Sequence, residues 1–392
     1  MTPLRLRPFL KIKDRFYCAN HQPLVDGAYR FFQKDMLKAK PAYIEDWKER
    51  QQEQSEKLPI ELLSKLLGGA EMHRSVYYQW PPTKAQDKNW CETDGLVIYD
   101  DHLLIVESKA GSFSYTSPTD DFDSHVKSLN ALVEKPSVQA RRFVDYLQSA
   151  PEVPLFVRNA DGTYREIRRL RWEDFRVATG LGVTLDNFAH LASRAESLQA
   201  LGVDLKGYPF WAVAFDDLLV YADIFRSPAV FAHFLEQRQQ AVANPRFVAT
   251  DEMDHLGMYL EHNQYSTLAD DFPGANHISW NGYSAKIDTY FHQLLADPDK
   301  AVLPVQGEVP PILSLVLAFL DRSSQPGRAL VASTLLNMSG DLRTQLAGLI
   351  QQMLQSQRHD RRVKPTSLFE GNNLSIICRQ PFATITDHER DE

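Results

Sequence analysis

Two acidic residues and a lysine stand at the ends of two neighbouring apolar segments in the middle of the chain. Asp94 lies near the start of the first segment, and a short polar turn over residues 99–102 leads to the second, which ends in Glu107-Ser108-Lys109. Side chains alternate between the two faces of a strand, so Glu107 and Lys109 share a face. If the two segments form a hairpin, the two carboxylates and the ammonium group converge at one point of a sheet.

Such a cluster has a definite chemistry. Paired carboxylate oxygens suit Mg²⁺ or Mn²⁺, and a neighbouring lysine can orient a water molecule or stabilise charge in a phosphoryl transition state. The alternative is a solvent-facing hairpin with an ion pair at its rim. The continuous apolar run over residues 103–106 predicts a strand buried on both faces. Charged groups that emerge from such a strand need partners or a metal, which favours a site.

The pattern Asp94…Glu107-Ser108-Lys109 resembles the D…(D/E)-x-K signature of the PD-(D/E)xK nuclease superfamily, and most closely its nuclease-related NERD-type domains. The likeness covers about residues 56–226. It departs from the strict motif because Thr93, not proline, precedes Asp94. The resemblance implies an α/β fold with a restriction-endonuclease-like core, in which helices flank a mixed central sheet. It also implies metal-dependent hydrolysis of phosphodiester bonds.

NERD-type domains also place a glutamate on the helix before the first core strand and a glutamine at the start of the helix after the E-x-K strand. A helical pattern over residues 57–67 ends at Gly68-Gly69 and offers Glu61, with Glu71 as a second candidate. Gln139 matches the glutamine, although an ordinary polar residue in a first helical turn is an equal reading. The resemblance implies that Glu61 holds a metal-bound water or a second metal, and that Gln139 hydrogen-bonds to the lysine or to a phosphate.

The same resemblance assigns roles to the hairpin residues. Asp94 and Glu107 are the expected ligands of Mg²⁺ or Mn²⁺, with the backbone carbonyl of Ser108 as a third oxygen. Lys109 is expected to orient the attacking water or to stabilise the developing charge. The expected catalytic residues are therefore Asp94, Glu107, Lys109, Gln139 and Glu61.

Composition is that of an ordinary globular protein. The chain has 392 residues, 43% of them hydrophobic and 24% charged, which allows two or three domains with a sizeable core. No apolar run reaches about 18 residues, so no membrane span is expected. The three cysteines are far apart and suggest neither a zinc site nor a disulfide framework. A cytoplasmic location is the expectation.

The formal net charge of −8 argues against a protein that coats nucleic acid through its overall field, but not against a nuclease with local contacts. Two local stretches, residues 158–171 and 358–364, are rich in arginine and could follow a phosphate backbone. Each of them taken singly is more typical of a solvated loop or a partner surface.

Three parts are expected: an N-terminal accessory segment over residues 1–55, a nuclease-like domain over 56–226, and a mainly helical C-terminal domain over 227–392. Residues 9–18 suggest an accessory hairpin to which no chemistry is assigned. The middle part should contain strands near 71–80, 90–99, 102–110, 175–184 and 210–215, and helices near 122–132, 138–149, 187–201 and 216–225. The last part, with a late strand at 374–378, is expected to serve partner binding, homo-oligomerisation or substrate gating.

The leading hypothesis is a Mg²⁺-dependent nuclease that acts on DNA, an endonuclease rather than an exonuclease, in a setting such as bacterial restriction or anti-phage defence. One alternative is the same fold acting on RNA. Another is an inactive nuclease fold that serves as an interaction module, which an intact Asp94, Glu107 and Lys109 set disfavours. A weaker alternative is a helical metal hydrolase built on His255 and His262, which lie two helical turns apart.

Overall fold

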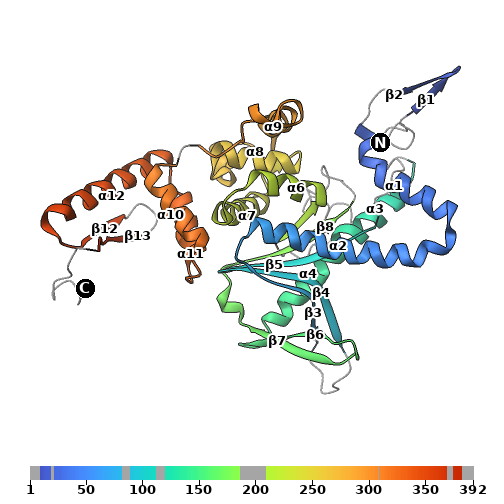
Figure 1. The fold of residues 1–392 in the computed structure, drawn as a ribbon, viewed down its shortest axis with the longest axis horizontal. Coiled ribbons are helices and arrows are strands. Elements are labelled where there is room, and N and C mark those ends of the chain that lie inside the picture. Colours follow the sequence, from blue (N-terminus) through green and yellow to red (C-terminus); the bar gives the residue numbers. More distant parts are fainter. Residues whose placement is uncertain are drawn as a thin grey trace.

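A mixed seven-stranded sheet forms the centre of the molecule (Figure 1). The computed structural model describes residues 9–18, 22–81, 89–111, 120–185, 209–307, 309–368 and 374–381. The strand order is β7-β6-β3-β4-β5-β8-β9, in which only the β5–β8 and β8–β9 pairs are parallel. The strands are β3 (Glu71–Gln79), β4 (Trp90–Tyr99), β5 (His102–Lys109), β6 (Val153–Arg158), β7 (Tyr164–Leu170), β8 (Val177–Thr184) and β9 (Phe210–Ala214). The expected α/β class with a mixed central sheet is confirmed.

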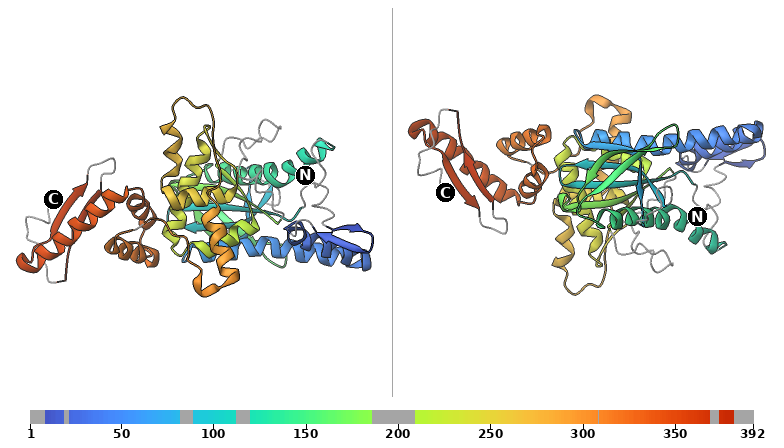
Figure 2. Two further views of the ribbon diagram at one scale, coloured as in Figure 1. Left: turned by 90° about the horizontal axis from the view of Figure 1, so that it is seen from above. Right: turned by 90° about the horizontal axis from the view of Figure 1, so that it is seen from below.

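Helices cover both faces of this sheet (Figure 2). On one face, α2 (Ile44–Leu66) and α6 (Phe215–Ile224) pack over Val97 and Val106. On the other, α4 (Lys135–Leu147) packs over Leu96 and Ile105. A helix α3 (Phe122–Leu129) and a π-helical turn (Asn130–Glu134) lead directly into α4. Neighbouring residues of β4 and of β5 thus serve opposite cores, which explains why both strands are continuously apolar.

The β6–β7 hairpin extends the sheet beyond β3 and was not predicted. It occupies the arginine-rich stretch that was considered as a phosphate-tracking surface. Three arginines of that stretch form ion pairs within the protein: Arg168 with Glu71 at 3.2 Å, Arg169 with Glu166 at 2.7 Å, and Arg171, just after β7, with Asp174 at 2.6 Å. The stretch is therefore largely a structural edge of the sheet.

The N-terminal segment leads into the sheet region without a break at residue 55. A two-stranded ribbon, β1 (Phe9–Ile12) and β2 (Arg15–Cys18), precedes α1 (Gln22–Ala39), and a 3₁₀ turn (Pro41–Tyr43) connects α1 to α2. The predicted ribbon at residues 9–18 is confirmed. Helix α2 runs through the boundary expected between residues 55 and 56, so its first half belongs to the N-terminal segment and its second half to the core.

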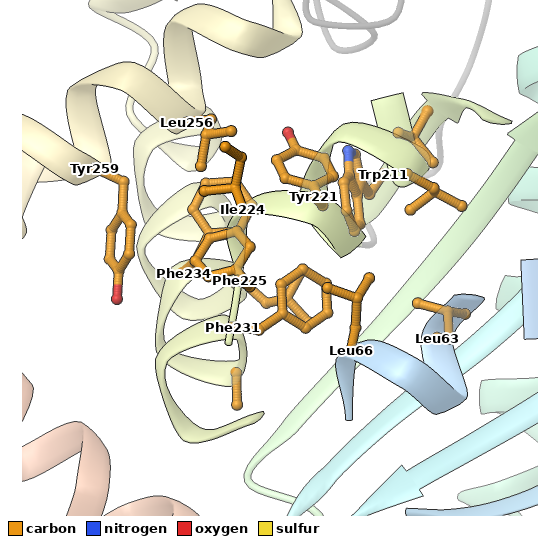
Figure 3. Close-up of a cluster of buried hydrophobic side chains, with 14 of the residues drawn as sticks. Leu63, Leu66, Trp211, Tyr221, Ile224, Phe225, Phe231, Phe234, Leu256 and Tyr259 are labelled. Carbon is orange, nitrogen blue, oxygen red and sulfur yellow. The ribbon is translucent and has the colours of Figure 1, made fainter. Parts of the chain in front are cut away.

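The helices after residue 227 begin as part of the same hydrophobic core. They include α7 (Pro228–Ala243), α8 (Glu252–His262) and α9 (Ala285–Ala296), with a small parallel pair, β10 (Phe247–Ala249) and β11 (Ile278–Trp280). Figure 3 shows Phe231 and Phe234 of α7 beside Phe225 and close to Leu66 of α2. One cluster of buried side chains therefore crosses the boundary expected at residues 226 and 227.

The described residues after 308, namely 309–368 and 374–381, extend away from the sheet and are called the C-terminal arm (Figures 1 and 2). It contains α10 (Pro311–Arg322), α11 (Arg328–Leu336), α12 (Gly340–Asp360), β12 (Lys364–Leu368) and β13 (Leu374–Cys378). Leu313, Leu346 and Met353 belong to its own small core. The predicted late strand at 374–378 is confirmed. No helix in the described ranges is both long and apolar enough to cross a membrane.

The arm contacts the turn between β4 and β5. The Asp100 carboxylate accepts hydrogen bonds from the backbone N–H groups of Gly327 (3.0 Å) and Ala329 (2.8 Å) at the start of α11. The guanidinium of Arg328 lies 4.5 Å from the centroid of the Tyr99 ring. A carboxylate at a helix N-terminus satisfies N–H groups that have no partner within the helix, so this turn serves as the cap of α11.

A second set of contacts joins the same turn to α7. The buried imidazole of His102 lies between the carboxylates of Asp101 (2.7 Å) and Glu236 (3.1 Å). Glu236 also pairs with Arg176 at 2.7 Å and accepts a hydrogen bond from Ser333 of α11 at 2.7 Å. The turn is therefore held by polar contacts from β8, α7 and α11.

A buried ion pair joins α7 to α8. Two guanidinium nitrogens of Arg238 bond to the two carboxylate oxygens of Glu252, both at 2.7 Å, and neither side chain is more than 4% exposed. Trp211 and Tyr221 donate further hydrogen bonds to Glu252, at 3.0 and 2.7 Å. This fully bonded arrangement offsets the cost of removing both charges from water.

We expect Glu252→Ala to reduce the free energy of unfolding by about 3–5 kcal/mol, because the Arg238 guanidinium would stay buried without its counter-charge. Urea denaturation followed by circular dichroism measures the effect. The matched control is Glu261→Ala on the same helix, which removes an exposed pair with Lys286 and should cost less than about 1 kcal/mol. Equal losses in the two variants would contradict the role given to the buried pair.

Candidate functional site

The β4–β5 hairpin brings the predicted residues together. The ladder pairs Gly95 with Val106, which places Asp94 and Glu107 next to each other at the end of the hairpin opposite its turn. The backbone N–H of Ser108 donates a hydrogen bond of 2.7 Å to Asp94 Oδ2. This bond fixes the Asp94 carboxylate against the end of β5.

Lys109 links the two carboxylates. Its Nζ lies 3.4 Å from Glu107 Oε2 and 4.0 Å from Asp94 Oδ2. The Glu107 side chain is fully buried, whereas those of Asp94 and Lys109 are 17% and 19% exposed. The cluster therefore has one fully buried carboxyl group, Glu107, and two charged side chains that reach solvent, Asp94 and Lys109, an arrangement suited to receiving a ligand from one side.

The electrostatics of the cluster are unbalanced. Burial, together with the nearby Asp94 carboxylate, raises the pKa of Glu107 to about 8, although Lys109 acts in the opposite direction. Burial also raises the pKa of Asp94, against the opposing effects of Lys109 and the Ser108 N–H group. One oxygen of Glu107, Oε1, is buried without a hydrogen-bond partner in the described structure. One lysine does not neutralise two buried carboxylates, so the cluster favours an additional cation or a proton.

A pocket of about 410 Å³ opens onto this cluster. Its lining comes from the end of the hairpin and from the first half of α2: Lys48, Gln51, Gln52, Ser55, Glu56, Asp94, Ser108, Lys109, Ala110 and Gly111. The pocket is where a substrate would meet the charged side chains.

The helix acid that reaches the pocket is Glu56, not Glu61. Glu61 is exposed and forms an ion pair with Lys57 at 3.5 Å. Glu56 lines the pocket, and partial burial raises its pKa, with Asp94 contributing in the same direction. Five residues along a helix correspond to roughly 140° of rotation at 3.6 residues per turn, so the two glutamates cannot face the same side.

The second candidate, Glu71, lies elsewhere. It is the first residue of β3, pairs across the sheet with Ile98, and forms ion pairs with His73 and Arg168. Asp94 is four residues from Ile98 along β4, or roughly 13 Å in an extended strand. Glu71 is therefore a structural residue of the sheet and does not join the cluster.

Helix α4 covers the face of the sheet opposite to α2, and strand alternation directs the side chains of Asp94 and Glu107 to this α4 face. Gln139 is half-buried there, and its Oε1 has no hydrogen-bond partner within the described ranges. The guanidinium of Arg142, one turn later, donates a hydrogen bond of 3.2 Å to the Tyr78 hydroxyl. Burial lowers the pKa of Arg142, but Tyr78 and, more weakly, Glu107 raise it above the ordinary value.

Arg142 was not among the predicted residues. It lies three positions after Gln139, so the two share a helix face, and that spacing is the sequence signal that would have found it. A hydrogen bond from Gln139 to Lys109 is not present among the described residues. The role predicted for Gln139 therefore stays a prediction.

The oxygen atoms of the cluster are suitable ligands for a metal ion, but the cluster has only two carboxylates. Within the described ranges, no group of three or more His, Cys, Asp and Glu side chains is arranged to hold a metal ion. Asp94 and Glu107 offer two carboxylates, and the unpartnered Oε1 of Glu107 is an oxygen that a hard cation would satisfy. The Ser108 carbonyl remains the expected third ligand, and the other positions would be filled by water.

The alternative histidine site does not assemble. His255 is fully buried, with Nδ1 3.1 Å from the Tyr265 hydroxyl. His262 lies at the surface beside Glu261, 3.7 Å away, and against the Tyr283 ring. The first histidine belongs to the core and the second to the surface. The expected helix at 187–201 and most of the loop after β5 lie outside the described residues.

Comparisons of the chain with protein-family models, with curated proteins and with solved structures find no match. The assignment of function therefore rests on the geometry and chemistry of the cluster.

We expect Glu107→Gln to change how stability depends on pH in the absence of metal. The raised pKa of Glu107 means that the folded protein favours the neutral carboxyl group. The stability that this group contributes is therefore fully present below about pH 4.5 and is lost as the pH rises towards about 8. Relative to wild type, Glu107→Gln should gain up to about 1.4 kcal/mol per pH unit within this window.

Urea denaturation at pH 5, 6.5 and 8 in EDTA measures this difference. Glu61→Gln is the control, because its carboxylate is exposed, and its stability should follow that of wild type at every pH. Parallel stability curves for wild type and Glu107→Gln would show that Glu107 is already ionised in the folded protein.

Proposed function

We propose that the protein is a divalent-metal-dependent nuclease of the PD-(D/E)xK type that hydrolyses phosphodiester bonds in DNA. The observation that carries the proposal is the position of Lys109, whose Nζ lies within 4.0 Å of both the Asp94 and the Glu107 carboxylates at the edge of a solvent-accessible pocket. The mixed sheet with helices on both faces supports it as well. The restriction-endonuclease-like core is part of the same proposal.

Mg²⁺ or Mn²⁺ bound by Asp94, Glu107 and the Ser108 carbonyl would polarise the phosphate and lower the pKa of a water molecule. Lys109 orients the attacking water and stabilises charge that develops on the phosphate oxygens. Glu56 takes the role first expected of Glu61, since it faces the pocket and can accept a hydrogen bond from a water above Asp94.

Two alternatives differ from this proposal, one in the substrate and one in the function. The same cluster could cleave RNA, because the chemistry at phosphorus is shared. An inactive interaction module is disfavoured, because the buried carboxylates and lysine impose an electrostatic cost that a purely structural site has no reason to keep. The substrate comparison below separates these possibilities.

We expect Asp94→Asn, Glu107→Gln and Lys109→Ala each to reduce the rate of DNA cleavage at least 100-fold, because each removes a charge that acts in the transition state. Labelled plasmid, single-stranded DNA and RNA are incubated with each purified variant in Mg²⁺, Mn²⁺ or EDTA. Cleavage that persists in all three variants would place the active site elsewhere. Faster cleavage of RNA would favour the first alternative, and no cleavage of any substrate by wild type would favour the second.

A matched pair on one helix tests the correction to the helix acid. Glu56→Gln should reduce cleavage at least ten-fold, because it removes an acidic group that lines the pocket. Glu61→Gln should leave the rate within about two-fold of wild type, because Glu61 is exposed and outside the pocket. The reverse result in single-turnover cleavage assays would restore the original assignment of Glu61.

A further inference from the structure

The N-terminal ribbon, residues 9–18, is exposed on both of its faces. Its strand register places Lys11 and Phe16 on one face and Arg15 and Tyr17 on the other. Phe16 is 67% exposed and Tyr17 47%, and the ammonium of Lys11 lies 5.7 Å from the centroid of the Phe16 ring. A two-stranded ribbon is only marginally stable on its own, and its exposed side chains include cations, aromatic rings and the aliphatic Leu10 and Ile12. Its two uncovered faces therefore indicate a surface that receives a partner.

The charge of this region differs in sign from that of the rest of the chain. Residues 1–40 contain nine lysines and arginines and three aspartates, a formal charge of +6. The remaining residues contain 34 basic and 48 acidic side chains, a formal charge of −14. In the described part of this region, the exposed cations include Lys11, Lys13, Arg15, Lys34 and Lys38. Such an excess of cations on an otherwise acidic protein favours a polyanionic partner.

Helix α1 connects the ribbon to the candidate active site. Arg30 donates hydrogen bonds to the backbone carbonyls of Ala110 (3.0 Å) and Gly111 (3.1 Å), which line the pocket. The side chain of Gln51, another lining residue, donates a hydrogen bond of 2.6 Å to the Tyr29 hydroxyl. The middle of α1 therefore forms the rim of the pocket.

The ribbon lies beyond this rim, on the side of the molecule away from the C-terminal arm (Figures 1 and 2). Arg30 is eight residues after the start of α1, or roughly 12 Å along the helix axis. Each base pair of a duplex advances about 3.4 Å. A duplex that enters the pocket therefore needs only several more base pairs to reach the ribbon.

We propose that the N-terminal ribbon binds in the major groove of duplex DNA next to the candidate active site and holds the substrate there. The inference rests on the proposed function for the identity of the polyanion. The major groove is about 12 Å wide and admits a two-stranded ribbon. Inside a groove, both faces of the ribbon meet the walls, so Lys11 and Arg15 reach phosphates on opposite strands. A single protein surface would cover only one face.

Fluorescence anisotropy with a labelled 30-base-pair DNA duplex in EDTA tests the inference without cleavage. The triple variant Lys11→Glu, Lys13→Glu, Arg15→Glu should raise the Kd at least ten-fold at about 100 mM salt. It should also reduce the slope of log Kd against log salt by about 3, because each lost phosphate contact removes about 0.9 from the slope. The triple glutamine variant should show a smaller loss in the same direction.

The matched control changes three exposed cations far from the ribbon by the same total charge: Lys300→Glu, Arg358→Glu and Arg362→Glu. This variant should bind the duplex within about two-fold of wild type. It also tests the second arginine-rich stretch of the sequence. Equal weakening in the two charge-reversed variants would show that only the overall charge matters and would overturn the inference.

Further outcomes distinguish other partners and separate this inference from the proposed function. A ribbon variant that binds the duplex like wild type but changes its oligomeric state in sedimentation would identify a second copy as the partner and overturn the inference. A larger loss for single-stranded DNA or for an RNA duplex than for the DNA duplex would overturn the groove assignment. If wild type cleaves DNA and the ribbon variant binds DNA normally, the proposed nuclease function stands and the proposed role of the ribbon is wrong. If binding depends on the ribbon but wild type does not cleave DNA, the role of the ribbon stands and the proposed nuclease function is wrong.

Discussion

The register of the β4–β5 hairpin is the constraint on which the candidate site depends. A shift of one residue in this pairing would move Asp94 or Glu107 to the opposite face of the sheet, because side chains alternate along a strand. The register is held at the other end of the hairpin, where Asp100 caps α11 and His102 lies between Asp101 and Glu236. The end that carries the carboxylates can therefore tolerate electrostatic strain, since the alignment of the strands is secured elsewhere.

The buried pair of Arg238 and Glu252 has a comparable role in the helices that follow. Its hydrogen bonds include groups from β9, α6, α7 and α8, so it fixes how these elements meet. Hydrophobic contacts such as those of Phe231 and Phe234 are less directional. The polar pair supplies the orientation that a purely apolar core would leave less well defined.

Sequence periodicity was sufficient for much of the sheet. The apolar runs of β4 and β5 and the turn between them predicted both strands and the convergence of Asp94, Glu107 and Lys109. Periodicity failed at the β6–β7 hairpin, because the arginines of β7 resembled a charged loop and the ion-pair partner of Arg168, Glu71, is distant in sequence.

The helix acid shows a different limit. Helix α2 contains several acidic residues, and neither its propensity nor its length reveals which side meets the sheet. That depends on tertiary packing, such as the contact of Ile60 with the position of Gly95, where even a Cβ atom would lie 2.3 Å from the Ile60 side chain. This close approach orients the helix and brings Glu56, not Glu61, over the pocket. The docking of α11 on α7 likewise follows from packing between residues distant in sequence, such as Ala229 and Ala332.

Residues 1–40 and the remainder of the chain carry opposite formal charges, +6 and −14, so the protein has a large electric dipole. The start of α1, next to the ribbon, lies roughly 12 Å along the helix axis from Arg30, where α1 meets the pocket, and electrostatic screening at 0.1 M salt acts over about 10 Å. The acidic body therefore only partly cancels the attraction of the ribbon cations for an approaching polyanion. The body repels the polyanion while the segment attracts it, so the direction of approach is selected before any contact forms.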